Sequence, residues 1–284
     1  MKAWEALAAE ASTELAEARL QTHWAAQLVA AFGDALVEPR PDDSHSSMGW
    51  DFDARSFVGE RTPQGWRASL TPATSTLALL DDRGAEQASL PLHGLTLQAG
   101  LTWMAETFAS LAGASAEKPL KLREYEMPPH DVAAGATFRR ASSAPYEELA
   151  RWYGNAARFC EAVRASTPGA SPVRCWPHHF DIATLVTLDR DEPDPERARS
   201  IGFGMTPGDD TYPEPYFYLN PWPRPKVQTT LPGLAGGAHW HTRGWIGAVL
   251  TATELGRADA ARQGAQVEAY VRSGMKAAQH LLEA

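Results

Sequence analysis

Histidines gather in two short segments of the chain, and one of these segments also carries an aspartate. The segments are VRCWPHHFDIATLVTLD, residues 173–189, and GGAHWHTRGW, residues 236–245, and together they hold four of the nine histidines. On a β-strand, side chains two residues apart lie on the same face. The spacing therefore predicts that His179 and Asp181 face together, and that His239 and His241 face together with Trp240 on the other side.

Three interpretations fit this residue set. If the two strands adjoin, the side chains of His179, Asp181, His239 and His241 converge and suit a divalent metal such as zinc, iron or manganese. Without a metal, Asp181 and His179 are the candidate catalytic residues, with Asp181 orienting His179 or His241 as a general base. The third interpretation is structural: HWHTRGW is a polar loop whose histidines bond to backbone or water.

An acidic and aromatic segment, TPGDDTYPEPYFYLNPWP, occupies residues 206–223. As a functional feature it supplies aromatic rings over a pocket, and it completes a candidate ligand-binding set of Trp176, Tyr216, Tyr218 and Trp240. As a structural feature it is a solvated acidic turn followed by a half-buried strand with Tyr216 and Tyr218 on one face. Prolines at both ends of that strand favour the edge of a sheet.

Composition narrows the class of protein. Hydrophobic residues make up 44% of the 284 residues and charged residues 21%, as is typical of a folded chain. A net charge of −9 without a basic stripe argues against nucleic-acid partners and against docking on anionic membranes. Two cysteines are too few for a disulfide framework. We therefore expect a soluble, cytoplasmic protein.

Several standard signatures are missing from the sequence. The N-terminal segment lacks the apolar core of a signal peptide, and no run approaches the roughly 18 apolar residues of a membrane helix. There is no Gly-x-Ser-x-Gly elbow, no Gly-x-Gly-x-x-Gly and no P-loop. The sequence therefore gives no support for a serine hydrolase of that type or for a nucleotide-binding site.

Hydrophobic periodicity predicts an α+β fold with mixed, largely antiparallel sheets flanked by long helices. Helical spacing marks residues 3–37, 95–113, 145–166 and 258–282, and strand-like runs lie between them. Thr251, followed three residues later by Glu254, resembles a capping box. Asp81-Asp82-Arg83-Gly84 between two apolar runs predicts a hairpin turn.

The chain is predicted to have an N-terminal α+β half over residues 1–118, a linker with one strand over 119–144, and a C-terminal α+β half over 145–284. Each half runs helix, strands, helix, and each carries a Phe-Asp pair, in WDFDARSFV and in HHFDIATLV. This likeness predicts an internal duplication in which the two halves pack together. The alternative is two unrelated α+β segments, since such an order of elements recurs by chance.

Three segments, SPVRCWPHHFDIA, SIGFGMTPG and PYFYLNPWP, resemble in order and spacing a bacterial family catalogued as domain of unknown function 5996. The resemblance covers most of the chain and is strongest over residues 171–223. It implies a related fold and no particular activity. Members of the family often have Gly-Ser where this chain has His178-His179, so the resemblance singles out Phe180 and Asp181 as the shared part.

The leading hypothesis is an enzyme that acts on a small molecule at the His/Asp site of the C-terminal half, with a divalent metal as its candidate cofactor. The alternative is a non-catalytic protein that binds a small ligand in an aromatic-lined pocket, or an interaction protein that forms homodimers. The alternative is motivated by ten tryptophans and seven tyrosines, since such residues are enriched in pockets and interfaces.

Overall fold

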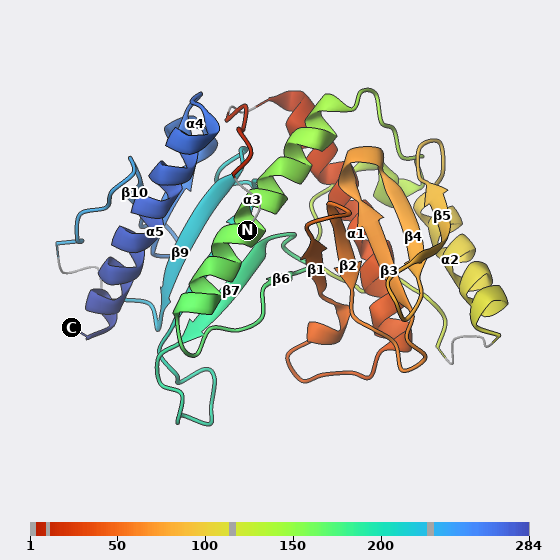
Figure 1. The fold of residues 1–284 in the computed structure, drawn as a ribbon, viewed down its shortest axis with the longest axis horizontal. Helices are drawn as coiled ribbons and strands as arrows, with labels where there is room; N and C mark the ends of the chain where they lie inside the picture. The colour runs from red at the N-terminus through yellow and green to blue at the C-terminus, as the bar shows by residue number, and fades with distance from the viewer. Residues whose placement is uncertain (1–3, 10–11, 114–117, 226–229, 284) are drawn as a thin grey trace. The chain divides into compact units, whose positions relative to one another are not determined.

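The computed structural model describes residues 4–9, 12–113, 118–225 and 230–283, which form α-helices and antiparallel β-strands (Figure 1). Contacts within the chain define two compact units, which we call unit 1 and unit 2. Unit 1 contains Met1–Ser12, Arg151–Val173 and Asp181–Ala284, and unit 2 contains Thr13–Ala150 and Arg174–Phe180. The α+β class is confirmed, whereas the duplication of two halves stays a prediction.

Unit 2 consists of a six-stranded antiparallel arrangement with two long helices. The helices are α1 (Thr13–Leu36) and α2 (Leu97–Ala112), and the strands are β1 (Met48–Asp51), β2 (Ser56–Gly59), β3 (Arg67–Thr71), β4 (Thr76–Leu80), β5 (Glu86–Pro91) and β6 (Arg174–Cys175). The strand order is β6-β1-β2-β3-β4-β5. Helix α1 packs on β2, β3 and α2, and its side chains Leu28 and Phe32 are buried there.

Local signals in the sequence account for most element boundaries of unit 2. Gly113 ends α2 with φ of 63°, the left-handed conformation that favours glycine at a helix C-terminus. The turn between β4 and β5 lies where it was predicted, and the Asp81 carboxylate accepts hydrogen bonds from the backbone N–H groups of Arg83 and Ala85. The first helix was predicted from residue 3, but it starts at Thr13, and the described residues 4–9 are not helical. Residues 3, 10 and 11 lie outside the described part.

Residues 48–60 form a hairpin of β1 and β2, because the Asp51 carboxylate accepts hydrogen bonds from the N–H groups of Asp53 and Ala54 and turns the chain. The predicted linker strand over residues 120–127 is wrong, since this segment forms no strand. Its contacts come from side chains instead, such as the ion pair of Arg123 with Asp34.

Unit 1 consists of five antiparallel strands and the helices that cover one of their faces. The helices are α3 (Ala144–Ser166, of which residues 151–166 belong to unit 1), α4 (Ala252–Leu255) and α5 (Ala260–Glu283), and the strands are β7 (Ile182–Thr187), β8 (Ser200–Thr206), β9 (Tyr216–Trp222), β10 (His239–His241) and β11 (Gly247–Thr251). The strand order is β10-β11-β9-β8-β7. The capping box of Thr251 and Glu254 at α4 is confirmed.

Strand β9 was predicted at an edge, and this is wrong, since β9 lies between β8 and β11. The prolines that suggested an edge do not interrupt the pairing with β11. That ladder joins Tyr216–Leu219 of β9 to β11, and Pro221 lies beyond it. A strand can therefore hold an interior position when its prolines fall outside the shorter of its two ladders.

The two faces of β9 have different surroundings. Phe217 is fully buried on the helix side, where its ring centroid lies 6.0 Å from that of Trp152 in α3, and α5 packs along β9 on the same side (Figure 1). Tyr218 lies on the opposite face, paired with Val249, which in turn pairs with His239. This register places the histidines of β10 on the same face as Tyr218, away from the helices.

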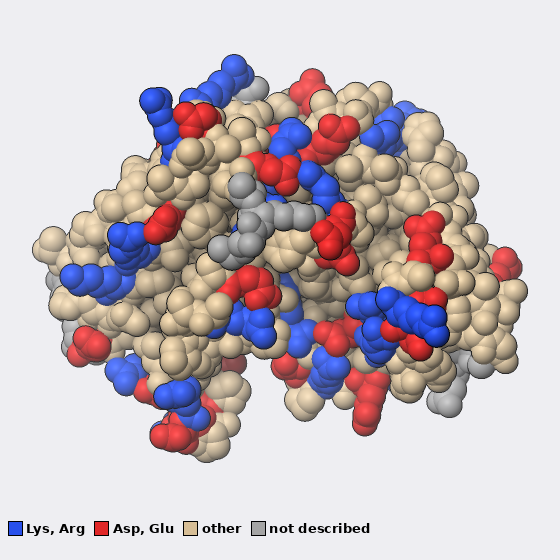
Figure 2. All heavy atoms as spheres, in the orientation of Figure 1, with Lys and Arg blue, Asp and Glu red and all other residues tan. Residues whose placement is uncertain are grey.

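Charges of both signs are interspersed over the face drawn in Figure 2, and no large field of one sign covers it. Within the described residues, no helix combines the length and apolar character that crossing a bilayer requires. Because charges of both signs are interspersed on it, the face drawn in Figure 2 has no basic stripe for a nucleic-acid backbone.

Candidate functional site

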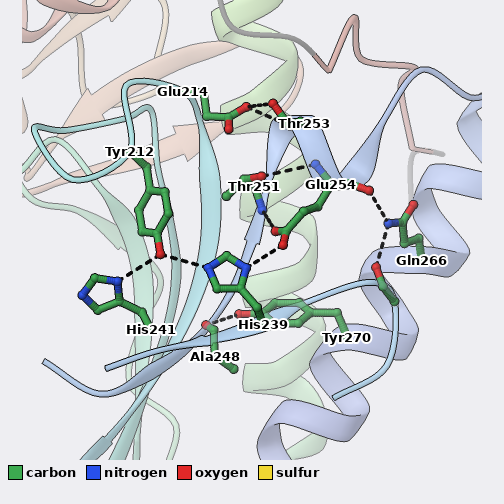
Figure 3. A network of polar contacts seen from close by, with 11 residues as sticks. Tyr212, Glu214, His239, His241, Ala248, Thr251, Thr253, Glu254, Gln266 and Tyr270 are labelled. Carbon is green, nitrogen blue, oxygen red and sulfur yellow. Dashed lines mark hydrogen bonds and ion pairs between the residues drawn. The ribbon is translucent and has the colours of Figure 1, made fainter. Parts of the chain in front are cut away.

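The two histidines of β10 converge on one hydroxyl group. The Tyr212 hydroxyl oxygen lies 2.9 Å from His239 Nε2 and 3.0 Å from His241 Nδ1 (Figure 3). His239 and His241 face together, as their spacing predicted, and the site forms because Tyr212 enters between them from the loop that joins β8 to β9. Two imidazoles and a phenol within hydrogen-bonding distance form an acid–base cluster.

Glu254 completes this cluster from the first turn of α4. One of its carboxylate oxygens, Oε1, lies 2.5 Å from His239 Nδ1, and the other, Oε2, accepts a hydrogen bond of 2.8 Å from the backbone N–H of Thr251. The same side chain therefore caps a helix and orients an imidazole ring. A carboxylate on one nitrogen of a histidine fixes which way the other nitrogen points, and here that nitrogen points at Tyr212.

A tight turn before β9 fixes the position of Tyr212. Asp209 Oδ1 accepts hydrogen bonds from the N–H groups of Thr211 at 2.8 Å and Tyr212 at 2.9 Å, and its Oδ2 accepts one from the Tyr216 hydroxyl at 2.5 Å. Glu214 then ties the loop to α4 by accepting hydrogen bonds from the N–H and hydroxyl of Thr253. The acids of this segment thus build the turn that presents the phenol.

Helix α5 supports the other side of the site. The Gln266 side-chain amide donates to the backbone carbonyls of Glu254 at 2.9 Å and Gly236 at 2.7 Å, and the Tyr270 hydroxyl donates to the carbonyl of Ala248 in β11 (Figure 3). Gln266 therefore links the helix that carries Glu254 to the loop that leads into β10. These contacts hold His239 and Glu254 beside one another.

The hydrogen bonds of the cluster require more protons than its neutral groups supply. The groups form a line, in order: the Glu254 carboxylate, His239, Tyr212, His241 and the Arg243 carbonyl, which lies 2.5 Å from His241 Nε2. Each of the four contacts uses one proton, whereas one tyrosine and two neutral imidazoles supply three. The line is complete only with one further proton, which makes one imidazole cationic or Glu254 neutral. The cluster can therefore hold a proton and release it.

Trp245 covers His241 from the side. The two rings are stacked, with centroids 4.5 Å apart and an interplanar angle of 23°. Gly247 lies opposite His241 in the β10–β11 ladder, and a Cβ at Gly247 would come within 2.2 Å of the Trp245 ring. Glycine at this position therefore leaves room for the indole, whose π face favours a cationic imidazole.

Tyr212 is held in its neutral form. Burial raises the pKa of the Tyr212 hydroxyl, and the nearby carboxylates of Glu254 and Asp209 raise it further. A raised pKa keeps the proton on the phenol at neutral pH, so the hydroxyl can both donate one hydrogen bond and accept another.

Asp181, the first choice from the sequence, lies elsewhere in unit 1. It directly precedes β7, and β8, β9 and β11 separate β7 from β10, so Asp181 does not join His239 and His241. It accepts a hydrogen bond from the Tyr218 hydroxyl instead. Gly204 makes this contact possible, since a Cβ there would lie 2.7 Å from that hydroxyl. Burial, followed by the charge of Asp181, raises the pKa of Tyr218 well above its usual value.

His179 and Trp176 belong to unit 2, in the turn after β6. Trp176 and His178 have ring centroids 6.3 Å apart, and the rings of His178 and His179 are 4.3 Å apart. Burial lowers the pKa of His178, and the neighbouring His179 lowers it further. The structure therefore places His179 among aromatic rings of its own unit, as part of a different cluster from His239 and His241.

The remaining ligand-binding candidates are held by their own hydrogen bonds. Tyr216 is buried, and burial and Asp209 raise its pKa. Trp240 points away from the two histidines, as predicted, and its indole N–H donates to the carbonyl of Pro232 at 2.7 Å. Tyr216 adjoins the cluster through Tyr212, whose ring centroid lies 4.9 Å away, whereas Trp240 supports the strand from the other side.

A metal centre finds no support among the described residues, which contain no group of three or more His, Cys, Asp or Glu side chains able to hold an ion. His239 Nε2 and His241 Nδ1, the nitrogen pair that faces the site, are both bonded to Tyr212. Two imidazoles and a neutral phenol fall short of the three or four ligands that zinc takes. The divalent metal that the sequence suggested therefore stays a prediction without support from this cluster.

Sequence reasoning missed Tyr212 and Glu254 as site residues. Tyr212 was part of the acidic and aromatic segment but was passed over in favour of Tyr216 and Tyr218. Glu254 was assigned only as a helix cap, which is correct but incomplete. A carboxylate placed just after a strand that follows the His-x-His segment was the available signal.

Comparison of the chain with family models, with curated proteins and with solved structures finds no match. The resemblance to the family of unknown function 5996 therefore stays a prediction, and the function must be argued from the site itself.

Proposed function

We propose that unit 1 is an acid–base catalyst for a small polar molecule, with the Tyr212 hydroxyl as the group that exchanges a proton with the substrate. The observation that carries the proposal is the convergence of His239 Nε2 and His241 Nδ1 on this one oxygen, at 2.9 and 3.0 Å. A hydroxyl between two imidazoles can relay a proton in either direction, because it gives its own proton to a neutral ring on one side and takes one from a protonated ring on the other.

The roles of the other residues follow from their contacts. Glu254 orients His239 and balances a positive charge on it, since their atoms are 2.5 Å apart. The His239 side chain is 40% exposed, so a small molecule can approach the cluster from solvent. A substrate oxygen would take one of the two hydrogen bonds of Tyr212, and the extra proton of the cluster would move to it or from it.

A ligand-binding protein without catalysis is the second candidate. Four rings follow one another here: Tyr216 and Tyr212 at 4.9 Å, Tyr212 and His241 at 5.7 Å, and His241 and Trp245 at 4.5 Å. Such a row of tilted rings offers apolar edges and faces to a ligand with an aromatic group. This candidate predicts saturable binding that Tyr212→Phe preserves, because the variant retains the ring.

Turnover of a panel of small esters, lactones, amides and hydroxy acids by wild type and Tyr212→Phe separates the two candidates. Removal of a general acid–base group lowers the rate by roughly 100-fold to 10,000-fold. Tyr125→Phe is the matched control, since the Tyr125 hydroxyl lies in unit 2 and accepts a hydrogen bond from Arg123. An activity that Tyr212→Phe retains in full would overturn the catalytic proposal.

A further inference from the structure

A charged cavity in unit 2 lies outside the residues that carry the proposed function. Its volume is about 780 Å³, and it opens where the last turn of α1, the loop that follows and residues 118–124 meet. Sites for small molecules in proteins occupy roughly 300–1,000 Å³. The cavity is therefore large enough to hold a small metabolite.

Positive side chains outnumber negative ones around this cavity. The cationic residues are Arg40, Lys118, Lys121 and Arg123, and the acidic residues are Asp34, Asp43 and Glu124. The chain as a whole has a net charge of −9 and only five lysines, two of which lie here. A local excess of positive charge in an acidic protein points to an anionic ligand.

The two arginines are already held in place by acids. Arg123 Nε lies 2.7 Å from Asp34 and its Nη2 lies 2.9 Å from Asp43, while Arg40 Nη2 lies 3.1 Å from Glu60. Ion pairs with acids and a hydrogen bond to Tyr125 raise the pKa of Arg123 against the effect of burial. These groups form a fixed wall whose charges largely balance.

The two lysines provide the unbalanced charge. Lys118 and Lys121 are exposed, and within the described ranges of the chain neither forms an ion pair or a hydrogen bond. A lysine ammonium acts as a point charge that adapts to an oxyanion through rotatable donors. The excess positive charge of the cavity therefore lies on groups that are free to bind a ligand.

His45 stiffens the floor beneath them. It is 3% exposed, its Nδ1 accepts a hydrogen bond from the backbone N–H of Arg40, and its Nε2 lies 3.0 Å from Asp34. Because Nδ1 accepts from the loop, the Nε2 side of the ring faces the Asp34 carboxylate. The loop after α1 and the acid that holds Arg123 are thus fastened to one another.

We propose that this cavity binds a small molecule with two or more negative charges, either a phosphate ester or a polycarboxylate. Lys118 and Lys121 bind its oxyanion groups directly, while Arg123 and Arg40 raise the local potential without leaving their acids. The inference is independent of the proposed catalytic site, because every residue it uses lies in unit 2.

Thermal unfolding of the full chain, titrated with inorganic pyrophosphate or with citrate at constant ionic strength, tests this site. Wild type is expected to show a saturable rise in Tm with at least one of the two anions. The double variant Lys118→Ala/Lys121→Ala is expected to weaken the apparent affinity roughly tenfold or more. Saturation with pyrophosphate alone identifies a phosphate ester as the ligand class, and saturation with citrate alone identifies a polycarboxylate.

Two further variants keep the test specific. Lys276→Ala removes an exposed lysine of unit 1 and should leave the affinity unchanged. Glu124→Gln removes an acid from the cavity and should tighten binding by about threefold, because it increases the positive excess. Equal affinity in wild type and in the double variant, or no saturable binding of either anion, would overturn the proposal.

Discussion

Two histidine–carboxylate pairs in this protein differ in their contact distances and in their surroundings. In unit 2, His45 Nε2 lies 3.0 Å from Asp34, and the two side chains are 3% and 18% exposed. In unit 1, His239 Nδ1 lies 2.5 Å from Glu254, and the two side chains are 40% and 27% exposed. The pair in unit 1 is therefore both the closer one and the more exposed one.

The proton count of the two pairs does separate them. His45 accepts one hydrogen bond from the backbone N–H of Arg40 through Nδ1, and its Nε2 lies 3.0 Å from the Asp34 carboxylate, so a neutral ring fits both contacts. His239 contacts a carboxylate on one side and the Tyr212 hydroxyl on the other, and the hydroxyl also contacts His241. The contacts of His45 need no further proton, whereas the contacts around Tyr212 need one more proton than the neutral groups supply.

The two acids also differ in the groups that balance their negative charge. Arg123 balances Asp34 through an ion pair of 2.7 Å. The second oxygen of Glu254 accepts only the backbone N–H of Thr251, and the described residues give it no other ion-pair partner than His239. Asp34 therefore shares its charge with an arginine, whereas Glu254 faces a histidine ring and a backbone N–H.

Replacement of the two histidines should give the largest difference in stability between the two pairs. His45→Ala is expected to lower the free energy of unfolding by about 4 kcal/mol, since it removes a buried partner of Asp34 and leaves a cavity. His239→Ala should lower it by less than about 1 kcal/mol, because its side chain is 40% exposed. Urea unfolding of both variants measures the difference. Equal losses would show that His239 is as structural as His45.

The buried histidines of unit 2 also predict a dependence on pH. Burial lowers the pKa of His23 to about 4, against 6.5 in the unfolded chain, and the charge of Arg19 lowers it further, while the hydrogen bond to the Pro177 carbonyl opposes this shift only in part. The unfolded chain therefore takes up a proton first as pH falls. Stability is complete above pH 6.5, declines towards pH 4, and changes no further below it, with a total loss of about 3 kcal/mol.

Unfolding free energies of wild type and His23→Leu between pH 7 and pH 4 check this prediction. The variant should lose most of the slope, because the titrating group is gone. Pro177 keeps a hydrogen-bond donor in the variant, since the Gln27 side-chain amide also donates to its carbonyl at 2.7 Å. A slope that stays the same in His23→Leu would assign the acid sensitivity to other groups.

Much of the fold was readable from local sequence signals. The helices over 145–166 and 95–113, the hairpin at Asp81 and the capping box at Thr251 each depend on residues close together in the chain, and each is confirmed. The position of β9 was not readable in this way. Which strands flank it is set by pairings over 10 or more residues, and the prolines gave a local signal that the distant ladder overrode.

The site shows the same limit. That His239 and His241 share a face follows from strand periodicity and was predictable. Glu254 reaches His239 because β10 pairs with β11. This pairing places the first turn of α4, which follows β11, beside the start of β10. That Tyr212 enters between the rings depends on the turn built by Asp209. Neither arrangement leaves a trace in spacing alone, and Asp181 was favoured because the family resemblance singled it out together with Phe180.

A methyl group at Gly247 should disturb the cluster of Tyr212, His239 and His241 without touching its polar residues. The added Cβ would meet the Trp245 ring at 2.2 Å and the Leu219 carbonyl at 2.7 Å, so Gly247→Ala should cost about 2 kcal/mol and displace the indole from His241. The matched control is Gly49→Ala in β1, where the nearest heavy atom lies 4.0 Å away. Tryptophan fluorescence and urea unfolding measure both effects, and equal stability of the two variants would contradict the packing argument.

The smallest effects should come from the two halves of the capping box, and they separate its structural role from its chemical one. Thr251→Val removes the hydroxyl that accepts from the Glu254 N–H at 3.2 Å and should cost about 1 kcal/mol. Glu254→Gln keeps an oxygen for the Thr251 N–H and should cost only about 0.3 kcal/mol, yet it removes the negative charge beside His239. Nitrogen-15 spectra of labelled histidines at neutral pH should show a shared extra proton on the rings of His239 and His241 in wild type and in Thr251→Val, and its loss in Glu254→Gln. An unchanged ring spectrum in Glu254→Gln would mean that Glu254 only caps its helix, and the two histidine–carboxylate pairs would then be alike.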